Sequence, residues 1–226
     1  MMTGEALSTW YHVVPMGHFG YPQPEDTWDR ATYGPDYCIR CGIAPTQLHP
    51  FRLRSEPGAK HSDVLWINWL YDEPFVRPHV AADLAAAGII GIEVLPVLRH
   101  KTGSPLGSLL QLRIRSSLPA GAVLTEGLQP VTCRVQNEES HLRPSGGESR
   151  IPPDAPYCGR TKFHPPQSPR VRESTFVDTA DIVRSAEWFG SGGQAFRQIF
   201  ASARMVELAK ARKWRGVRWE EPNLTP

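Results

Sequence analysis

Two cysteines separated by two residues, Cys38 and Cys41, form the motif in this sequence whose spacing most directly predicts chemistry. Gly42 follows at once. In a zinc knuckle, a Cys-x-x-Cys turn places two thiolates on one metal ion. The residue after the second cysteine often needs a positive φ angle, which glycine adopts without steric cost. The pattern therefore predicts one half of a zinc site.

The second half must come from a distant part of the chain, since one pair supplies only two of the four ligands that zinc prefers. Cys158 is followed by Gly159, as at the end of a second knuckle. Three residues before Cys158, however, the chain has Ala155 where a second Cys-x-x-Cys would need cysteine. The second knuckle is therefore predicted to be incomplete.

Three residues compete to be the fourth ligand, namely Cys133, His61 and His164, and spacing does not choose between them. Cys133 lies in the alternating stretch "VTCRV", which equally indicates a small core residue. If no fourth ligand is recruited, the site is a remnant that has lost its zinc. Our predicted ligand set is the complete group of cysteines: Cys38, Cys41, Cys158 and Cys133.

A redox role for Cys38 and Cys41 fits the sequence less well. A redox Cys-x-x-Cys pair follows a strand and opens a helix, whose N-terminus lowers the thiol pKa. Here "TYGPDY" precedes the pair, and Gly42 and Pro45 interrupt the helix that would have to follow. The pair is therefore expected to bind metal.

No other motif supports catalysis. The glycine-rich "GSGG" at 190–193 lacks the Lys-Ser/Thr ending of a phosphate-binding loop and is expected to link two elements. The sequence has no G-x-S-x-G or H-E-x-x-H motif, and its histidines show no helical ligand spacing. We therefore expect a protein that is not an enzyme.

Two basic stretches with nearby aromatic residues allow nucleic-acid binding, a common use of small zinc modules. They are "RTKFHPPQSPRVR" (160–172) and "RKWRGVRW" (212–219). Arginine and lysine could contact phosphates while aromatic rings stack on bases. The competing interpretation is that Trp214, Val217 and Trp219 pack inward and the basic side chains face solvent.

The composition is that of a globular protein: 226 residues, 40% hydrophobic and 21% charged, with a net charge of +2. The first twenty residues do not resemble a signal peptide, and no segment approaches the roughly 18 apolar residues that span a bilayer. These features predict a cytoplasmic protein with no membrane contact. In that compartment a close cysteine pair indicates a metal site before a disulfide.

The expected fold class is α+β, with mixed sheet elements and two helix–turn–strand units around a zinc-ribbon-like cysteine cluster. In the first unit, Asp72 is expected to cap a helix with Pro74 in its first turn, Gly88 to end it, and "IIGIEVLPVL" to form a strand. In the second, a helix starting after "GSGG" and running to about Lys213 precedes a strand at "RGVRWEE". Phe75–Gly91 and Phe200–Gly216 have equal spacing, which indicates either internal duplication or only two similar motifs.

The domain prediction is one domain over 1–226, or two apposed lobes, 1–135 and 151–226, joined by a polar loop at 136–150. That loop is rich in glycine, proline and polar residues.

The order of these motifs resembles the double Cys-x-x-Cys-Gly motif family, best known as a set of myxobacterial paralogues. The matching features are the first Cys-x-x-Cys-Gly, the late "IPPDAPYCGR" and the ending "FASARMVELAKARKWRGVRWEEP". The resemblance implies a zinc site that includes Cys38, Cys41 and Cys158, with Ala155 as the departure. It also implies immunity against polymorphic toxins, and hence a cognate toxin as partner. The alternative function is a zinc-ribbon nucleic-acid-binding protein.

Overall fold

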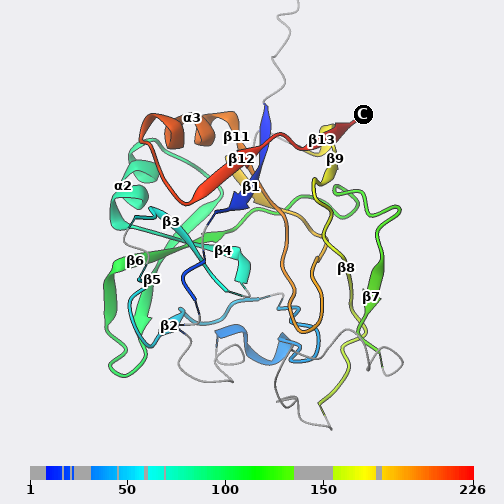
Figure 1. Cartoon of the computed structure of the whole chain (residues 1–226), viewed down its shortest axis with the longest axis horizontal. Coiled ribbons are helices and arrows are strands. Elements are labelled where there is room, and N and C mark those ends of the chain that lie inside the picture. The colour runs from blue at the N-terminus through cyan, green and yellow to red at the C-terminus, as the bar shows by residue number, and fades with distance from the viewer. Residues whose placement is uncertain are drawn as a thin grey trace, which may run out of the picture.

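The computed structural model describes residues 9–16, 18–20, 22, 32–44, 46–58, 61–68, 70–134, 155–176 and 180–226. Within them the chain has a mixed α+β fold in which strands predominate and two α-helices lie side by side (Figure 1). The helices are α2 (Pro78–Ala86) and α3 (Ala203–Ala211). The expected loop 136–150 lies outside the described residues, so the prediction of one domain or two lobes remains a prediction.

Two sheets form the body of the fold. The larger has the strand order β2 (Arg52–Leu53), β5 (Ile92–Arg99), β6 (Pro105–Ile114), β4 (Leu70–Val76) and β3 (Val64–Ile67). The second has the order β10 (Ile182–Arg184), β11 (Ile199–Ser202), β1 (Trp10–Pro15) and β12 (Val217–Glu220).

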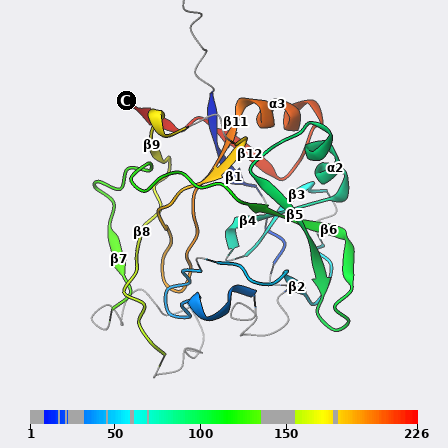
Figure 2. The same ribbon diagram turned by 180° about the vertical axis from the view of Figure 1, so that it is seen from behind.

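Two smaller strand pairs complete the sheet structure. One joins β9 (Arg170–Arg172) to β13 (Asn223–Thr225) in parallel, and the other joins β7 (Pro130–Thr132) to β8 (Thr161–Phe163) in antiparallel fashion. Short 3₁₀ helices lie at Gly34–Asp36 and Glu173–Thr175. Opposite views place α2 and α3 on one side of the molecule and the β7–β8 pair on the other (Figures 1 and 2).

The first strand–helix–strand unit starts its helix later than the sequence predicts. Asp72 and Pro74 lie in strand β4, not at a helix N-terminus, and α2 begins at Pro78, the next proline along the chain. Pro78 suits the first helical turn because the missing N–H is not needed there. Val80 and Leu84 then face the main hydrophobic core. Gly88, with φ of 62°, follows the helix end.

The second unit also differs from its prediction at the start. Residues Ile199–Ser202 form strand β11 rather than helix, because they pair with both β1 and β10. The helix α3 begins only at Ala203. The Ser202 hydroxyl caps it by accepting a hydrogen bond from the backbone N–H of Met205 at 3.3 Å. The strand after the helix, β12, lies where the sequence predicts it.

The two units repeat their geometry as well as their spacing. Phe75 and Phe200 each lie on a strand, three residues before a nine-residue helix. Gly91 and Gly216 precede the following strands with φ of 95° and 99°. A Cβ on Gly91 would overlap the carbonyl of Ile182, on the strand β10 that pairs with β11 of the second unit. A Cβ on Gly216 would overlap the carbonyl of Val64, on the strand β3 that pairs with β4 of the first unit.

A pair of aspartates completes this reciprocal arrangement. The backbone N–H of Ile90 donates to the Asp181 carboxylate at 3.0 Å, and that of Arg215 donates to the Asp63 carboxylate at 2.8 Å. The backbone carbonyl of each aspartate also accepts a hydrogen bond from the backbone N–H of the residue before a helix. Arg77, before α2, donates to Asp63, and Ser202, before α3, donates to Asp181. Each unit therefore fixes the helix-to-strand turn of the other.

The helices of the two units share one core. Met205, Val206 and Trp214 from the second unit pack in the same cluster as Val80 and Leu84 from the first. In the described part of the chain, no helix has both the length and the apolar character required to cross a bilayer.

Candidate metal centre

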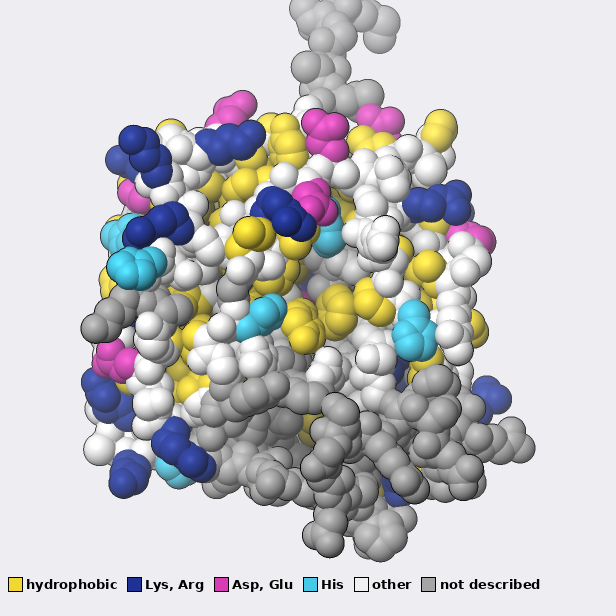
Figure 3. Space-filling view, in the orientation of Figure 1, with side chains coloured by type: hydrophobic (Ala, Val, Ile, Leu, Met, Phe, Trp, Pro, Cys, Tyr) yellow, Lys and Arg dark blue, Asp and Glu magenta, His cyan; other side chains and the backbone are white. Residues whose placement is uncertain are grey.

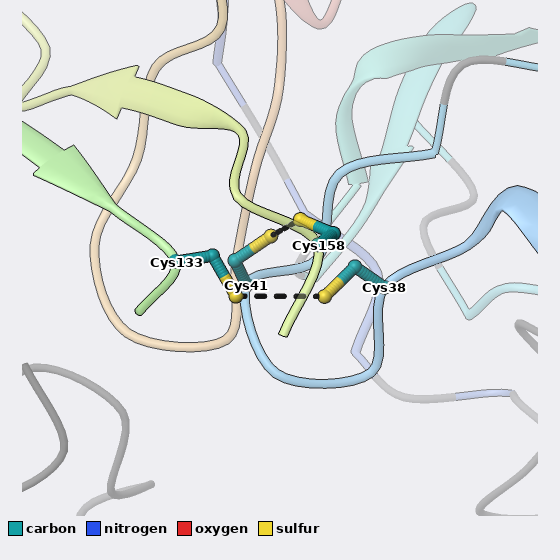
Figure 4. Close-up of side chains that lie close together, drawn as sticks. All are labelled: Cys38, Cys41, Cys133 and Cys158. Carbon is teal, nitrogen blue, oxygen red and sulfur yellow. Dashed lines mark hydrogen bonds between the residues drawn. The ribbon is translucent and has the colours of Figure 1, made fainter. Parts of the chain in front are cut away.

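All four cysteines of the chain come together at one point (Figure 4). Their Sγ atoms lie within 4.8 Å of one another. The Cys38 and Cys133 sulfurs are 3.8 Å apart, and those of Cys41 and Cys158 are 3.6 Å apart. Sulfur atoms at the corners of a tetrahedron with Zn–S bonds of about 2.3 Å are about 3.8 Å apart. The cluster therefore has the dimensions of a four-thiolate metal site.

The first half of the site is a tight turn between Cys38 and Cys41. The Cys38 N–H donates to the Ile43 carbonyl at 3.0 Å, and the Gly42 N–H donates to the Cys38 carbonyl at 2.8 Å. Gly42 has φ of 79°, and a Cβ there would also overlap the carbonyl oxygen of Gly193. Glycine is thus required both by the backbone conformation and by the close approach of a second loop.

The second half reproduces this turn with two separate segments. Cys133 directly follows β7, and Cys158 lies just before β8, so the β7–β8 pairing brings the two cysteines together. The Cys133 N–H donates to the Arg160 carbonyl at 2.9 Å, and the Gly159 N–H donates to the Cys133 carbonyl at 3.2 Å. These bonds match those of the first knuckle, with φ of 70° at Gly159.

Cys133 therefore stands where the first cysteine of a second knuckle would stand. Cys133 is buried in a hydrophobic cluster, as a small core residue would be, and its sulfur also belongs to the group of four that could hold a metal ion. Neither His61 nor His164 belongs to the group that the described residues assemble. Sequence spacing could not predict that Cys133 pairs with Cys158, because this pairing depends on two strands, β7 and β8, that are far apart in the chain.

Two arginines fasten the halves of the site to each other. Arg40, inside the first knuckle, donates from Nε to the Ala155 carbonyl at 2.6 Å, and its guanidinium lies 4.2 Å from the centre of the Tyr157 ring. In the other direction, Arg160 donates to the Asp36 carbonyl at 2.9 Å. Ala155 thus contributes its backbone, and not a metal ligand, to the site.

Lys162 on β8 contacts the candidate site, which the sequence did not reveal. It belongs to one of the basic stretches expected to face solvent, yet it is fully buried. Its Nζ donates to the carbonyls of Cys41, Gly192 and Gln194 at 2.8, 2.6 and 2.6 Å. Burial lowers the Lys162 pKa to about 8, and the nearby cysteines oppose that shift.

The lysine explains the position of the glycine-rich segment 190–193. Because its ammonium bridges the first knuckle to the carbonyls of this segment, the loop packs directly against Gly42. The segment therefore does more than link two elements. It forms one wall of the cysteine site.

The electrostatics of the four thiols favour a bound cation. The interaction with the Cys41 thiol lowers the Cys38 pKa to about 4, and the same interaction raises the pKa of Cys41. Burial raises the pKa of Cys133 to about 11. Sulfurs this close cannot all ionise without a compensating charge. A divalent cation supplies that charge and displaces the protons, so the arrangement is suited to hold a metal ion.

A cavity of about 590 Å³ borders the cysteine site. Cys38 and Cys158 lie in its wall, together with Tyr37, Tyr157 and Arg160. Cys158 is the only one of the four cysteines that is not fully buried. Metal ions and chelators therefore have a route to the sulfurs from this side.

Comparisons with known proteins assign no family. No model of a known protein family matches the chain, and no curated protein matches it. The similarity to the double Cys-x-x-Cys-Gly proteins therefore remains a hypothesis that rests on the motifs. Function has to be argued from the four-cysteine geometry itself.

Proposed function

We propose that Cys38, Cys41, Cys133 and Cys158 bind one zinc ion in a structural, zinc-ribbon-like site. The observation that supports this most strongly is the assembly of four sulfurs within 4.8 Å, in two turns with the same hydrogen bonds. A set of four sulfur ligands on a tetrahedron is typical of structural zinc. All four positions are filled by protein, which leaves none open for a substrate or a catalytic water.

The role of the zinc is to hold three distant segments together. The first knuckle, the ends of β7 and β8, and the loop 190–194 meet at this point. Among the described residues, the hydrophobic cluster at this point is smaller than the other three, and besides the cysteines it consists of Ile43, Ala195, Tyr157 and Trp188. Metal binding therefore contributes directly to the folding free energy of this region.

On this scaffold, we propose a non-enzymatic binding function in the cytoplasm, with immunity to a polymorphic toxin as the favoured form. The motif resemblance suggests the immunity role. A metal site with all four positions filled by cysteine is consistent with an immunity role, because an immunity protein acts by covering a surface of its toxin and needs no catalytic residues. A reducing cytoplasm would also keep the four thiols available for metal.

The alternative, a zinc-ribbon nucleic-acid-binding protein, has less support. Three arginines of 212–219 are already engaged in ion pairs: Arg212 with Asp83, Arg215 with Asp63 and Arg218 with Glu220. Trp214 is only 8% exposed, and Lys162 of the other basic stretch is fully buried. Trp214 and Lys162 are therefore not available to stack on bases or to contact phosphates, and the three arginines would contact phosphates in competition with their ion pairs.

One experiment tests the proposed zinc site, and a second tests the proposed binding function. Protein purified without chelator should contain one zinc per chain, and its removal should lower the melting temperature; protein with no zinc would refute the structural site. For the binding function, the chain is co-expressed with the product of a neighbouring gene that is toxic on its own. Rescue of growth together with co-purification supports immunity. Failure of both removes that proposal and leaves the zinc site standing.

A further inference from the structure

A second site lies at the opening between β1 and the segment that leads into β11. Strand β1 pairs with β11 only from Trp10 to His12, whereas Val13–Pro15 continue along β12 alone. The segment before Ile199 diverges at this point and leaves a cavity of about 350 Å³. Figure 3 shows this face of the molecule, hollowed near its centre, with hydrophobic side chains in and around the hollow. Cavities of this size are typical of small-ligand sites.

The walls of the cavity are mostly apolar and include two aromatic rings that are tilted by 60° to each other. They include the rings of Tyr71 and Phe196, whose centroids are 5.2 Å apart, and the side chains of Pro165 and Pro166. Aromatic and proline rings offer planar surfaces against which another ring can pack with good contact. A ligand ring can pack on one of these surfaces and meet another with its edge, which favours a flat ligand over a branched one.

A buried pair of polar side chains, His12 and Gln198, forms one edge of the cavity. His12 is 9% exposed and Gln198 is 6% exposed. The His12 Nε2 lies 2.6 Å from the Gln198 Oε1. In the tautomer with the ring proton on Nε2, the ring donates to this amide oxygen and Nδ1 is an acceptor. Nδ1 has no hydrogen-bond partner within the described part of the chain. Burial lowers the His12 pKa, which keeps the ring neutral.

Gln198 is held in position by its backbone. Its N–H donates to the Ser185 hydroxyl at 3.0 Å, and its carbonyl accepts from the Ser185 N–H at 2.8 Å. With Oε1 occupied by His12, the amide NH₂ group remains as a donor toward a ligand. The edge thus offers a hydrogen-bonding group on a rigid backbone.

The charge of the site is balanced without a ligand. Arg197 lines the cavity, but its Nε donates to the Asp72 carboxylate at 3.3 Å. Its guanidinium also lies 4.7 Å from the centre of the Trp188 ring. An anionic ligand would have to compete with Asp72, so an uncharged ligand fits better.

We infer that this cavity binds a flat, uncharged aromatic ring that carries a hydrogen-bonding edge, packed against Tyr71 and Phe196 and bonded to Gln198. Such a ring can come from a free heterocycle or from an aromatic side chain of a protein partner. The site goes beyond the proposed zinc function. The two sites share the loop 190–194, which lines this cavity through Gly190, Ser191 and Gln194 and also packs against the first knuckle, but Tyr71, Phe196 and Gln198 themselves are not part of the cysteine site.

The test is an NMR titration of the zinc-loaded full chain with three probes. Adenine represents a free heterocycle, N-acetyl-tyrosinamide represents a side chain, and cyclohexanol is a polar ring that is not flat. We expect saturable shifts with at least one flat probe and none with cyclohexanol. Adenine alone would assign the site to a free heterocycle, and tyrosinamide alone to a partner side chain. The inference fails if neither flat probe saturates or if cyclohexanol binds equally well.

Variants locate the binding. Ser191→Trp places a large ring at an exposed residue of the cavity wall and should abolish binding while the fold and the zinc content are retained. Gln198→Met removes the donor and should weaken binding about two- to tenfold, the usual effect of one hydrogen bond. His61→Asn, an exposed histidine outside the cavity, is the matched control and should bind as the parent does. Unchanged binding by Ser191→Trp would overturn the inference.

Discussion

The substitution Lys162→Met tests how the buried lysine supports the metal centre. It removes an ammonium group and leaves the carbonyls of Cys41, Gly192 and Gln194 without their shared donor. Methionine is of similar length and apolar, so the cavity created is small. The loss should therefore report on the charge and its hydrogen bonds, and not on packing.

The magnitude follows from two opposing contributions. Hydrogen bonds from a charged donor contribute about 1.5–3 kcal/mol each, and Lys162 makes three of them. Against this, a Lys162 pKa lowered to about 8 corresponds to a burial cost of roughly 3 kcal/mol. We expect Lys162→Met to lower the free energy of unfolding by about 3 kcal/mol, in the range found when one member of a buried polar group is removed.

The effect should be larger with metal bound. All four cysteines act on Lys162 in the direction that favours its charge, and a zinc ion with four thiolates carries a net charge of −2. We therefore expect zinc affinity to fall by about tenfold, equivalent to about 1.4 kcal/mol.

The assay is urea unfolding with zinc and with EDTA, together with a competition titration for zinc. Lys101→Met, at an exposed turn, is the control and should leave both quantities unchanged. A loss below about 1 kcal/mol, or an unchanged zinc affinity, would show that the ammonium does not support the site.

Three further predictions address other parts of the structure. Cys133→Ser should abolish stoichiometric zinc binding, whereas Ala155→Ser should leave the zinc content at one per chain, because only Cys133 belongs to the sulfur cluster. Equal zinc content in the two variants would contradict this prediction. Gly159→Ala should lower the free energy of unfolding by about 1–2 kcal/mol, because alanine is strained at this positive φ. Gly42→Ala should lower it clearly more, because the new Cβ also overlaps the Gly193 carbonyl. Similar losses in urea unfolding would show that this overlap is not important. Burial places the folded-state His12 pKa below its usual 6.5. The unfolded state therefore binds the proton first on acidification, and the free energy of unfolding in EDTA should fall as the pH drops below about 6.5. His12→Asn should show a shallower pH dependence, and an identical profile would exclude His12 as a source of that dependence.

The sequence was sufficient to predict the first knuckle and the overall class of fold. Cys38, Cys41 and Gly42 are neighbours, so their geometry follows from local rules that the sequence carries. The same holds for the end of the first helix at Gly88.

What the sequence could not predict depends on long-range pairing. Asp72 and Pro74 have the types expected at a helix start, but β4 pairs at Phe75 and Val76 with two other strands, and the helix is delayed to Pro78. Likewise, β11 lies between two strands that are far from it in the chain. In both places tertiary hydrogen bonds outweigh the local signals.

The same limitation applies to the second half of the site. Cys133 joins Cys158 only because β7 pairs with β8, and Lys162 is buried only because the loop 190–194 folds over it. A lysine between threonine and phenylalanine in a short strand gives no sign of this on its own. Its burial in the middle position of β8 is consistent with the alternation of a strand, which is the one signal that could have suggested it.

The most direct test of the central claim is X-ray absorption spectroscopy at the zinc edge on protein purified without chelator. The four-cysteine site predicts one zinc per chain with a first shell of four sulfur atoms at about 2.3 Å. A shell that contains nitrogen or oxygen neighbours near 2.0–2.1 Å, or a protein that retains no zinc, would contradict it.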